Sequence, residues 1–447
     1  MSRAIMRLLS YHFFIASRIK SRIMQLNQVC FRTLHLPEPW TLNAYESVGG
    51  YQVLRKILAE KIPSAEIIET IKNSGLRGRG GAGFPTGLKW SFISPTIPGQ
   101  KYILCNSDES EPGTCKDRDI LRFNPHQVLE GIAIACYVMR ATVGYNFLRG
   151  EFYEPFLRCE AALKEMYDAG LAGKNVLGSG FDFDIYNHYS AGAYICGEET
   201  GLMNSLEGKR GIPRFKPPFP ANFGLYGRPT NVNNTESYAS IPVILERGAE
   251  WFAKLGPEKS GGTKIFSVSG HVNKPGNFEV PLGTPFSELL KLAGGPLDNI
   301  PIKAVIPGGS SMPVLPAEII MRTNMDYDSL SKAGSSLGSG AVIVMNEKTC
   351  MVRALKRISK FYMHESCGQC TPCREGTGWI YRLVEKIEEG HGTIEDLEQL
   401  RNVAKRIEGR TICAFGEAAA WPVGGFLKHF YDEFSYHVTH KHCLVAH

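Results

Sequence analysis

Hydrophobic and polar positions in the first half of the chain switch between helix and strand spacing. Ile67, Ile68 and Ile71 recur at helical spacing in residues 64–73, and Gly75 follows this segment. Short apolar runs then alternate with longer amphipathic stretches. The expected strands are 101–105, 143–148 and 181–186, and the expected helices between them are 124–139 and 153–168. This alternation predicts a mainly parallel sheet of the α/β class.

The second half of the chain shows two further patterns. Residues 264–270 and 278–280 have strand patterns on either side of a Pro275-Gly276 turn, and residues 285–293 have a helical one. They predict a small α+β domain that ends near residues 342–345. Beyond residue 346 the pattern is helical, and short connections predict an antiparallel bundle. Its four expected helices are 348–362, 374–389, 393–408 and 417–434.

Length and charge limit the possible classes of protein. A chain of 447 residues exceeds a single core of about 250–300 residues, so we expect domains at 38–255, 256–346 and 347–447. The net charge of +6 comes from residues 1–37, which hold basic side chains and no acid. The neutral remainder argues against nucleic-acid binding. No apolar run reaches the roughly 20 residues of a membrane span, so membrane contact is expected only through partners.

The basic leader, residues 1–37, has two interpretations. Its arginine-rich, acid-free composition is typical of a mitochondrial targeting segment. Alternatively, the start codon is assigned too far upstream and Met24 is the true start. Under either interpretation, we expect the leader to lie outside the fold.

Three cysteines lie close together in the sequence Cys367-Gly-Gln-Cys370-Thr-Pro-Cys373. In an up-down bundle, the loop that carries Cys413 lies at the same end as this loop. A compact C-x2-C-x2-C loop with one remote thiolate favours a [4Fe–4S] cluster. Zinc is the alternative, although structural zinc usually binds two cysteine pairs. A loop without metal is the third possibility.

A glycine-rich segment precedes the first predicted strand. Gly78-x-Gly80-x-x-Gly83 matches the dinucleotide fingerprint, but a helix precedes it and Pro85 follows, so the usual Rossmann context is absent. Clustered glycines still allow a flat or phosphorylated ligand to approach the backbone. Nearby charges and rings suit such a ligand: Arg77, Arg79 and Lys89 for phosphates, and Phe84, Trp90 and Phe92 for stacking. A flexible turn is the alternative.

Acidic loops follow two of the predicted strands, where open α/β sheets bind ligands. The first loop carries Asn106, Asp108, Glu109 and Glu111, and we expect Glu111 to meet ribose hydroxyls and to favour NADH over NADPH. The second runs through residues 194–200, and a helix is expected to begin after Gly197, which favours anions. One carboxylate among Asp108, Glu109, Glu198 and Glu199 is expected to serve only as a helix cap.

Taken in order, these motifs resemble the family of NADH-binding flavoprotein subunits of respiratory NADH:quinone oxidoreductase (complex I), over about residues 37–431. The resemblance rests on residues 78–84, 106–111, 194–200, 216–221, 232–234 and 365–376. It implies a Rossmann-like FMN/NADH domain, a ubiquitin-like α+β domain and a four-helix bundle with the iron–sulfur cluster. The chain departs from the family pattern at Ser190, Gly201, Thr235 and Ser237, which affects the expected local packing of the flavin loops and removes none of the implied ligands.

The resemblance also implies the site residues. Cys367, Cys370, Cys373 and Cys413 would hold the [4Fe–4S] cluster, and Glu199 and Glu111 would act in catalysis at the nicotinamide. The residues implied in binding FMN or NADH are Gly78, Arg79, Gly80, Gly81, Ala82, Gly83, Phe84, Lys89, Phe92, Asn106, Asp108, Glu109, Glu111, Tyr194, Gly197, Glu198, Glu199, Phe219, Val232, Asn233 and Asn234.

The implied function is that of an electron-input subunit. NADH gives a hydride to FMN, and single electrons pass to the [4Fe–4S] cluster and on toward quinone. The implied partners are a thioredoxin-like [2Fe–2S] subunit and a large iron–sulfur subunit. The implied location is the peripheral arm of a membrane complex, on the cytoplasmic side of a bacterial inner membrane, or on the mitochondrial matrix side if the leader is a transit peptide.

Two alternatives belong to different classes of function. The first is the diaphorase subunit of an NAD-linked hydrogenase or formate dehydrogenase. Many such chains carry a thioredoxin-like domain before the glycine loop, and too few residues precede Gly78 to form one here. The second is a non-catalytic scaffold stabilised by zinc, which would leave the glycine and acidic loops unexplained.

Overall fold

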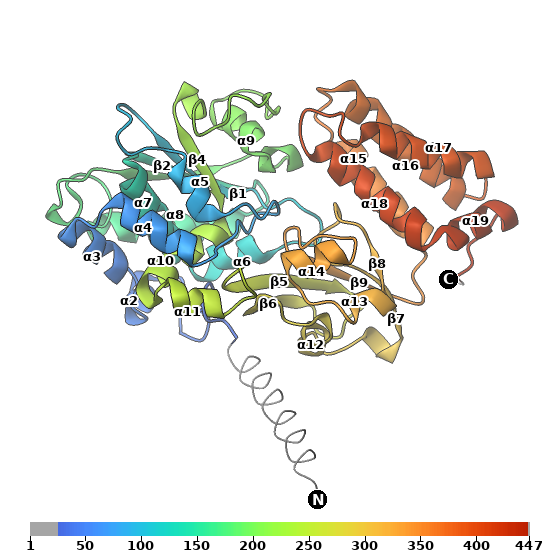
Figure 1. Ribbon diagram of the computed structural model, residues 1–447, viewed down its shortest axis with the longest axis horizontal. Coiled ribbons are helices and arrows are strands. Elements are labelled where there is room, and N and C mark those ends of the chain that lie inside the picture. Colours follow the sequence, from blue (N-terminus) through green and yellow to red (C-terminus); the bar gives the residue numbers. More distant parts are fainter. Residues whose placement is uncertain (1–25, 446–447) are drawn as a thin grey trace, which may run out of the picture.

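The computed structural model describes residues 26–445. Figure 1 shows an α/β region in blue to green, a β-rich region in yellow and orange beside it, and a bundle of red helices at the C-terminal end. No helix in the described range combines the length and the apolar character that crossing a membrane requires. The first 25 residues of the expected leader lie outside the described residues.

The first sheet has four strands in the order β3-β2-β1-β4, and all neighbours are parallel, as predicted. Its strands are β1 (Tyr102–Ser107), β2 (Val143–Leu148), β3 (Asp184–Tyr189) and β4 (Thr230–Asn234). The prediction for β2 is confirmed at both ends, whereas β3 begins later than expected. The sequence analysis missed β4, because the run Thr-Asn-Val-Asn-Asn is polar although its residues are mostly buried.

Helices cover this sheet and connect its strands. They are α2 (Leu42–Ser47), α3 (Gln52–Glu60), α4 (Ser64–Asn73), α5 (Thr86–Ser91), α6 (Lys116–Phe123), α7 (Pro125–Met139), α8 (Tyr153–Asp168), α9 (Glu199–Leu206), α10 (Thr235–Arg247) and α11 (Ala249–Lys254). The predictions for α4 and α8 are confirmed at both ends. Every residue of α7 is buried. At Gly131 a Cβ would lie 2.2 Å from the Tyr238 carbonyl oxygen, so glycine lets α7 pack directly on α10.

The second sheet forms the predicted α+β domain. Its order is β6-β5-β9-β7-β8, with β5 and β9 parallel and the other neighbours antiparallel. Its elements are β5 (Thr263–Gly270), β6 (Gly276–Pro281), α12 (Phe286–Leu292), β7 (Ile302–Ile306), β8 (Leu315–Pro316), α13 (Ala317–Ile320), α14 (Tyr327–Lys332) and β9 (Ala341–Asn346). Buried apolar side chains from its sheet and helices form a separate core.

The C-terminal region contains five described helices rather than the expected four. They are α15 (Met351–Glu365), α16 (Thr371–Glu388), α17 (Ile394–Ile407), α18 (Phe415–His429) and α19 (Tyr431–His440). The expected helix 417–434 is wrong in its extent, because the backbone leaves helical geometry at Phe430. This break lets α19 turn back on the bundle, where Phe434 and Val438 join the core.

The end of the expected leader belongs to the folded body. Val29, Cys30 and Phe31 are buried, and their backbone N–H groups donate to the Glu279 carboxylate at 2.9, 3.0 and 2.9 Å. Arg32 pairs with Glu246. The expectation that residues up to 37 lie outside the fold is therefore wrong for this segment.

Candidate functional site

The glycine loop between α4 and α5 is a closed, braced turn. The Gly78 N–H donates to the Phe84 carbonyl at 2.8 Å, and the Arg77 Nε donates to the Gly83 carbonyl at 2.8 Å. Gly83 has φ 64°, and a Cβ there would lie 2.6 Å from the Tyr327 ring. At Gly80 a Cβ would lie 3.1 Å from Asn234 Cβ. The loop therefore needs glycine because β4 and α14 approach it closely, which disfavours the flexible-turn alternative.

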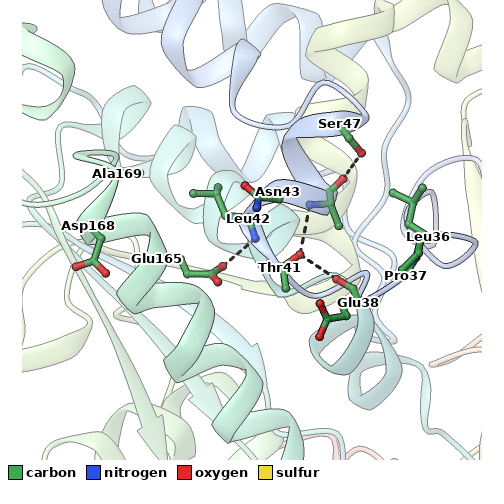
Figure 2. Close-up of a pocket in the computed structure, with 11 residues that line it drawn as sticks. Leu36, Pro37, Glu38, Thr41, Leu42, Asn43, Ser47, Glu165, Asp168 and Ala169 are labelled. Atoms are coloured by element: carbon green, nitrogen blue, oxygen red, sulfur yellow. Dashed lines mark hydrogen bonds between the residues drawn. The ribbon is translucent and has the colours of Figure 1, made fainter.

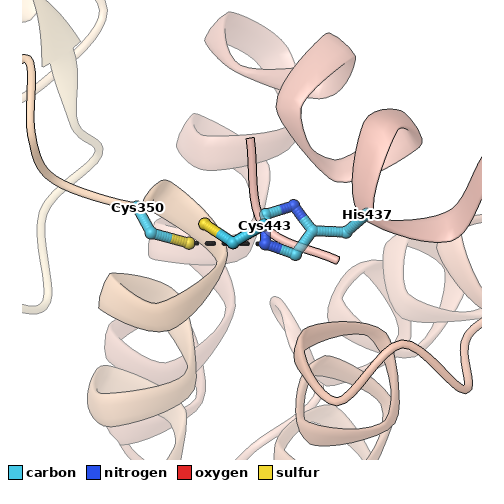
Figure 3. Close-up of side chains that lie close together, drawn as sticks. All are labelled: Cys350, His437 and Cys443. Carbon is cyan, nitrogen blue, oxygen red and sulfur yellow. Dashed lines mark hydrogen bonds between the residues drawn. The ribbon is translucent and has the colours of Figure 1, made fainter. Parts of the chain in front are cut away.

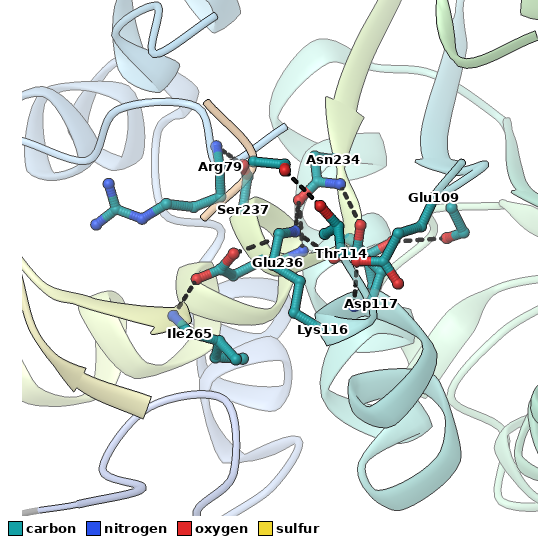
Figure 4. Close-up of polar contacts among 12 residues, drawn as sticks. Arg79, Glu109, Thr114, Lys116, Asp117, Asn234, Glu236, Ser237 and Ile265 are labelled. Carbon is teal, nitrogen blue, oxygen red and sulfur yellow. Dashed lines mark hydrogen bonds and ion pairs between the residues drawn. The ribbon is translucent and has the colours of Figure 1, made fainter. Parts of the chain in front are cut away.

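Arg79, for which a phosphate contact is expected, is fully buried, and its Nε and Nη1 have no hydrogen-bond partner among the described residues. Its Nη2 donates to the Gly261 carbonyl at 2.8 Å, and its backbone N–H donates to Ser237 Oγ at 2.9 Å. Figure 4 shows the guanidinium pointing away from Asn234 and Glu109. Ser237, one of the departures from the family pattern, thus supplies a hydroxyl that anchors the loop, and the Arg79 side chain reaches the Gly261 carbonyl.

A buried charge network supports the loop from below (Figure 4). Glu236 accepts from Lys264 Nζ at 2.5 Å and from the Ile265 N–H at 2.9 Å, and its carboxylate lies 3.1 Å from Lys116 Nζ. Burial would raise the pKa of Glu236, but Lys264 and Lys116 outweigh it and keep the pKa low. Burial lowers the pKa of Lys264 to about 8. Removing the one charge of Glu236 would leave two buried cations underbalanced.

The carboxyl end of β1 presents an unpaired acceptor. Asn106 Nδ2 donates to the Gly197 carbonyl at 2.8 Å, which joins the two acidic loops. Asp108 Oδ2 is buried and has no hydrogen-bond partner among the described residues. Burial raises the pKa of Asp108 to about 7, although Arg149 opposes the shift. Because a buried unpaired acceptor is costly, this oxygen suits an N–H or O–H group of a bound ligand.

Two of the four candidate carboxylates cap helices, where one was expected. Glu198 Oε2 accepts from the N–H groups of Thr200 and Gly201 at the start of α9, at 2.8 and 2.9 Å. Glu109 accepts from the N–H groups of Asp117 and Arg118 at the start of α6, at 2.9 and 3.0 Å. The expected helix start after Gly197 is confirmed, since α9 begins at Glu199.

Glu199 lies between two lysines. Its carboxylate is 3.1 Å from Lys89 Nζ and 2.7 Å from Lys216 Nζ. Burial would raise the pKa of Glu199, but the two ammonium groups outweigh it and hold the pKa below its ordinary value. Lys216 also contacts Glu198 Oε1 at 2.9 Å. The sequence analysis did not assign Lys216 a role, although it opens one of the quoted motifs.

The aromatic side chains expected at the site divide into exposed and buried ones. Phe84, Phe92 and Phe219 are 44%, 51% and 56% exposed, and the rings of Phe84 and Phe92 lie 6.0 Å apart. Such faces suit stacking with a flat ligand. Trp90, in contrast, is fully buried and donates through Nε1 to Asn233 Oδ1 at 3.0 Å. Trp90 therefore has no open stacking face, and Val232 also lies in the core.

Glu111 has protein donors on both oxygens. Oε2 accepts from the Tyr194 hydroxyl at 2.7 Å, and Oε1 accepts from the Ser311 N–H at 2.7 Å and from the Ser310 hydroxyl at 3.3 Å. Burial raises the pKa of Glu111, and these donors oppose the shift. The structure thus places Glu111 between the α/β and α+β domains, where protein donors contact both of its oxygens.

An aromatic cluster connects Tyr194 with the cysteine loops. The Tyr194 ring packs edge-on against Phe361, Tyr362 and Phe415, with centroids 5.3, 5.9 and 5.6 Å away. The Tyr194 N–H also donates to Glu365 at 3.1 Å, at the end of α15. The loops at the carboxyl end of the first sheet therefore pack directly on the helices that carry the cysteines.

The four expected cluster ligands come together, as the bundle topology predicts. Cys373 lies in the same hydrophobic core cluster as Phe415. Three further side chains pack against this cluster: Cys367, Cys370 and Cys413. Burial and the neighbouring thiols raise the pKa of Cys373 to about 12.

A separate cavity of about 710 Å³ lies between α2 and α8 (Figure 2). Its lining includes Glu38, Thr41, Glu165 and Asp168, and no residue of the glycine loop, the acidic loops or the cysteine loops contributes to it. It is therefore distinct from the candidate site.

Comparison with known proteins places the chain among close relatives. It is 53% identical over 407 residues to the F subunit of NADH-quinone oxidoreductase from Rickettsia bellii (strain OSU 85-389), a match that covers 90% of this chain and 97% of the relative. It is 57% identical over 371 residues to the corresponding protein of Rickettsia typhi, with 82% and 87% covered. The chain belongs to the family of NADH-quinone oxidoreductase F subunits. Three models match parts of it: Nuo51 FMN-binding domain at 71–243, SLBB domain at 265–315 and NADH-ubiquinone oxidoreductase-F iron-sulfur binding region at 353–437.

Solved structures include a more distant relative. The chain is 34% identical to NAD⁺-reducing [NiFe]-hydrogenase in its H₂-reduced state, with a TM-score of 0.78. The match covers 86% of this chain but 64% of the hydrogenase chain. As a member of the family of F subunits, the chain has FMN and a [4Fe–4S] cluster as cofactors. The unpaired Asp108 oxygen, the braced glycine loop and the four gathered cysteines fit these groups.

Proposed function

We propose that NADH is oxidised between the glycine loop and Glu199, and that electrons leave the chain through the cysteine site toward quinone. The observation that carries this proposal is the cluster around Tyr194, which packs the nucleotide loops directly against the cysteine-bearing helices. FMN, when bound, supplies the conversion between two-electron and one-electron transfer. The protein supplies alignment and excludes water from both groups.

Individual side chains have separate tasks in this proposal. Asp108 accepts a hydrogen bond from the flavin through its unpaired oxygen. Glu199 stays ionised because of Lys89 and Lys216, and it sets the charge next to the nicotinamide. Phe84, Phe92 and Phe219 provide stacking faces. Glu111 acts as a positioning residue that holds the Tyr194 hydroxyl.

The proposal includes partners and a location. Electrons pass from this chain to a thioredoxin-like [2Fe–2S] subunit and to a large iron–sulfur subunit in the peripheral arm of a membrane complex. The names of the relatives support this, since they describe one subunit of a larger quinone-reducing enzyme. The arm faces the bacterial cytoplasm, or the mitochondrial matrix if the leader is a transit peptide.

A diaphorase role is the second candidate, because a hydrogenase chain shares this fold at 34% identity. Native affinity purification separates the two. Co-purifying NADH-dependent quinone reduction supports the first candidate, whereas H₂-dependent NAD⁺ reduction supports the second.

The chemistry is tested on anaerobically purified full-length protein and on a Cys413→Ser variant. The wild type is expected to release FMN on denaturation, to reduce ferricyanide with NADH and to show a reduced-cluster EPR signal. The variant is expected to keep FMN and ferricyanide reduction and to lose the native cluster signal. A colourless, zinc-containing wild-type protein, or one that NADH does not reduce, would contradict the proposal.

A further inference from the structure

A second group of metal-ligating side chains lies at the opposite end of α15 from the cluster loop. Cys350, His437 and Cys443 present ligand atoms that all lie within 4.8 Å of one another. Figure 3 shows them converging from three segments: the start of α15, helix α19 and the chain beyond α19. Cys350 and His437 are buried and Cys443 is half-buried. Among the described residues, this is the group with ligand spacing for a single ion.

The spacing fits tetrahedral zinc. Cys350 Sγ lies 3.5 Å from His437 Nε2. Zinc binds thiolate sulfur at about 2.3 Å and imidazole nitrogen at about 2.0–2.1 Å. With a tetrahedral angle between these two bonds, the sulfur and nitrogen lie about 3.5 Å apart, which is the observed distance. A direct S–H···N hydrogen bond gives a similar distance, and two further contacts hold Cys350 and His437 in the geometry that zinc needs.

The first contact orients the histidine. His437 Nδ1 lies 2.8 Å from the Glu433 carbonyl oxygen, so Nδ1 carries the proton and donates it. Nε2 is then left with its lone pair directed at the two cysteines. A backbone carbonyl on the non-ligating nitrogen is the usual outer contact of a zinc-binding histidine.

The second contact orients the Cys350 side chain. Cys350 is the N-cap of α15, and its Sγ accepts from the Arg353 N–H at 3.3 Å. Glu433 holds the start of α15 in place, because its carboxylate accepts from the Met351 N–H at 2.8 Å and pairs with Lys303 at 2.6 Å. Cys350 and His437 are therefore held by surrounding structure before any ion binds.

We propose that Cys350, His437 and Cys443 bind one zinc ion, which fastens the C-terminal segment to the start of α15. Binding releases one proton from each thiol to solvent and forms two Zn–S bonds and one Zn–N bond. Water completes the tetrahedron, because three protein ligands leave the fourth position open. The site is separate from the cluster, since α15 runs from Met351 to Glu365 between them.

The test measures zinc and iron together in full-length protein purified anaerobically with its cluster intact. The wild type is expected to contain one zinc for every four irons. Cys443→Ser and His437→Gln are expected to keep iron, FMN and NADH oxidation, and to bind zinc more than about 10-fold more weakly. Cys413→Ser serves as the matched control: it loses iron and keeps the zinc.

Two measurements on the wild type keep the proposal falsifiable if a variant fails to fold. X-ray absorption at the zinc edge is expected to show two sulfur neighbours at about 2.3 Å and one nitrogen at about 2.0 Å. Peptide mapping is expected to find Cys350 and Cys443 as free thiols after zinc removal. A Cys350–Cys443 disulfide, an absence of zinc, or zinc retained in both ligand variants would overturn the proposal. None of these readouts depends on the flavin chemistry.

Discussion

Replacing Lys216 with methionine tests how the ionisation of Glu199 is maintained. The ammonium of Lys216 lies 2.7 Å from Glu199 and 2.9 Å from Glu198, and methionine removes the charge while keeping much of the side-chain volume. Lys89, at 3.1 Å, then becomes the remaining cation beside Glu199. Because burial already favours the neutral acid, the pKa of Glu199 is expected to rise.

The size of the rise follows from the geometry. Two unit charges about 4 Å apart interact by about 4 kcal/mol at an effective dielectric constant of 20. The Lys216 side chain is 29% exposed, so solvent and salt screen part of this interaction. Taking roughly a third of it leaves about 1.4 kcal/mol, which corresponds to about one pKa unit.

The assay is the pH dependence of kcat/KM for NADH oxidation with ferricyanide. In Lys216→Met, the acidic limb of this profile is expected to move upward by about one pH unit. Lys209→Met is the matched control, because Lys209 is an exposed lysine that pairs with Glu207 at 2.7 Å. If the profiles of the Lys216 and Lys209 variants coincide with that of the wild type, the assigned role of the lysine is wrong.

Three further variants test other parts of the structure. Glu236→Gln leaves Lys116 and Lys264 underbalanced and is expected to lower the unfolding free energy by about 3–5 kcal/mol in urea titrations; Glu250→Gln, at the exposed Lys254 pair, should cause no measurable change. Glu279→Ala removes the acceptor for Val29, Cys30 and Phe31, so trypsin should cleave after Arg32 faster than in the wild type. An unchanged cleavage rate would show that the segment is held by other contacts. Asp108 has a folded-state pKa of about 7 against an ordinary value of 3.8, so the folded protein holds this proton more tightly than the unfolded chain does. The resulting contribution to the free energy of unfolding is complete below pH 3.8 and is lost as the pH rises through about 7. In flavin-free Asp108→Asn, the free energy of unfolding measured by urea titration should fall less over this pH range than in the wild type. An equally steep fall would contradict the assigned burial.

Hydrophobic periodicity predicted much of the fold. Helices α4 and α8 and strand β2 match their predicted bounds, because each buries one continuous face and needs no distant information to be recognised. Strand β4 was missed because its asparagines are polar and yet buried. The break between α18 and α19 was also missed, because it depends on where Phe434 packs in the core.

The sequence by itself determined which candidate functional groups the chain carries. They are a glycine loop, two acidic loops and three cysteines with a remote fourth. It also determined that the cysteines meet, since antiparallel helices place alternate loops at one end. The tertiary structure alone decided which polar groups pair with other groups of the protein and which stay available to a ligand. Lys216 reaches Glu199, Glu111 binds Tyr194, and Cys350 meets Cys443 only after the chain has closed. Such pairings depend on the packing of distant segments, and no local pattern in the sequence encodes them.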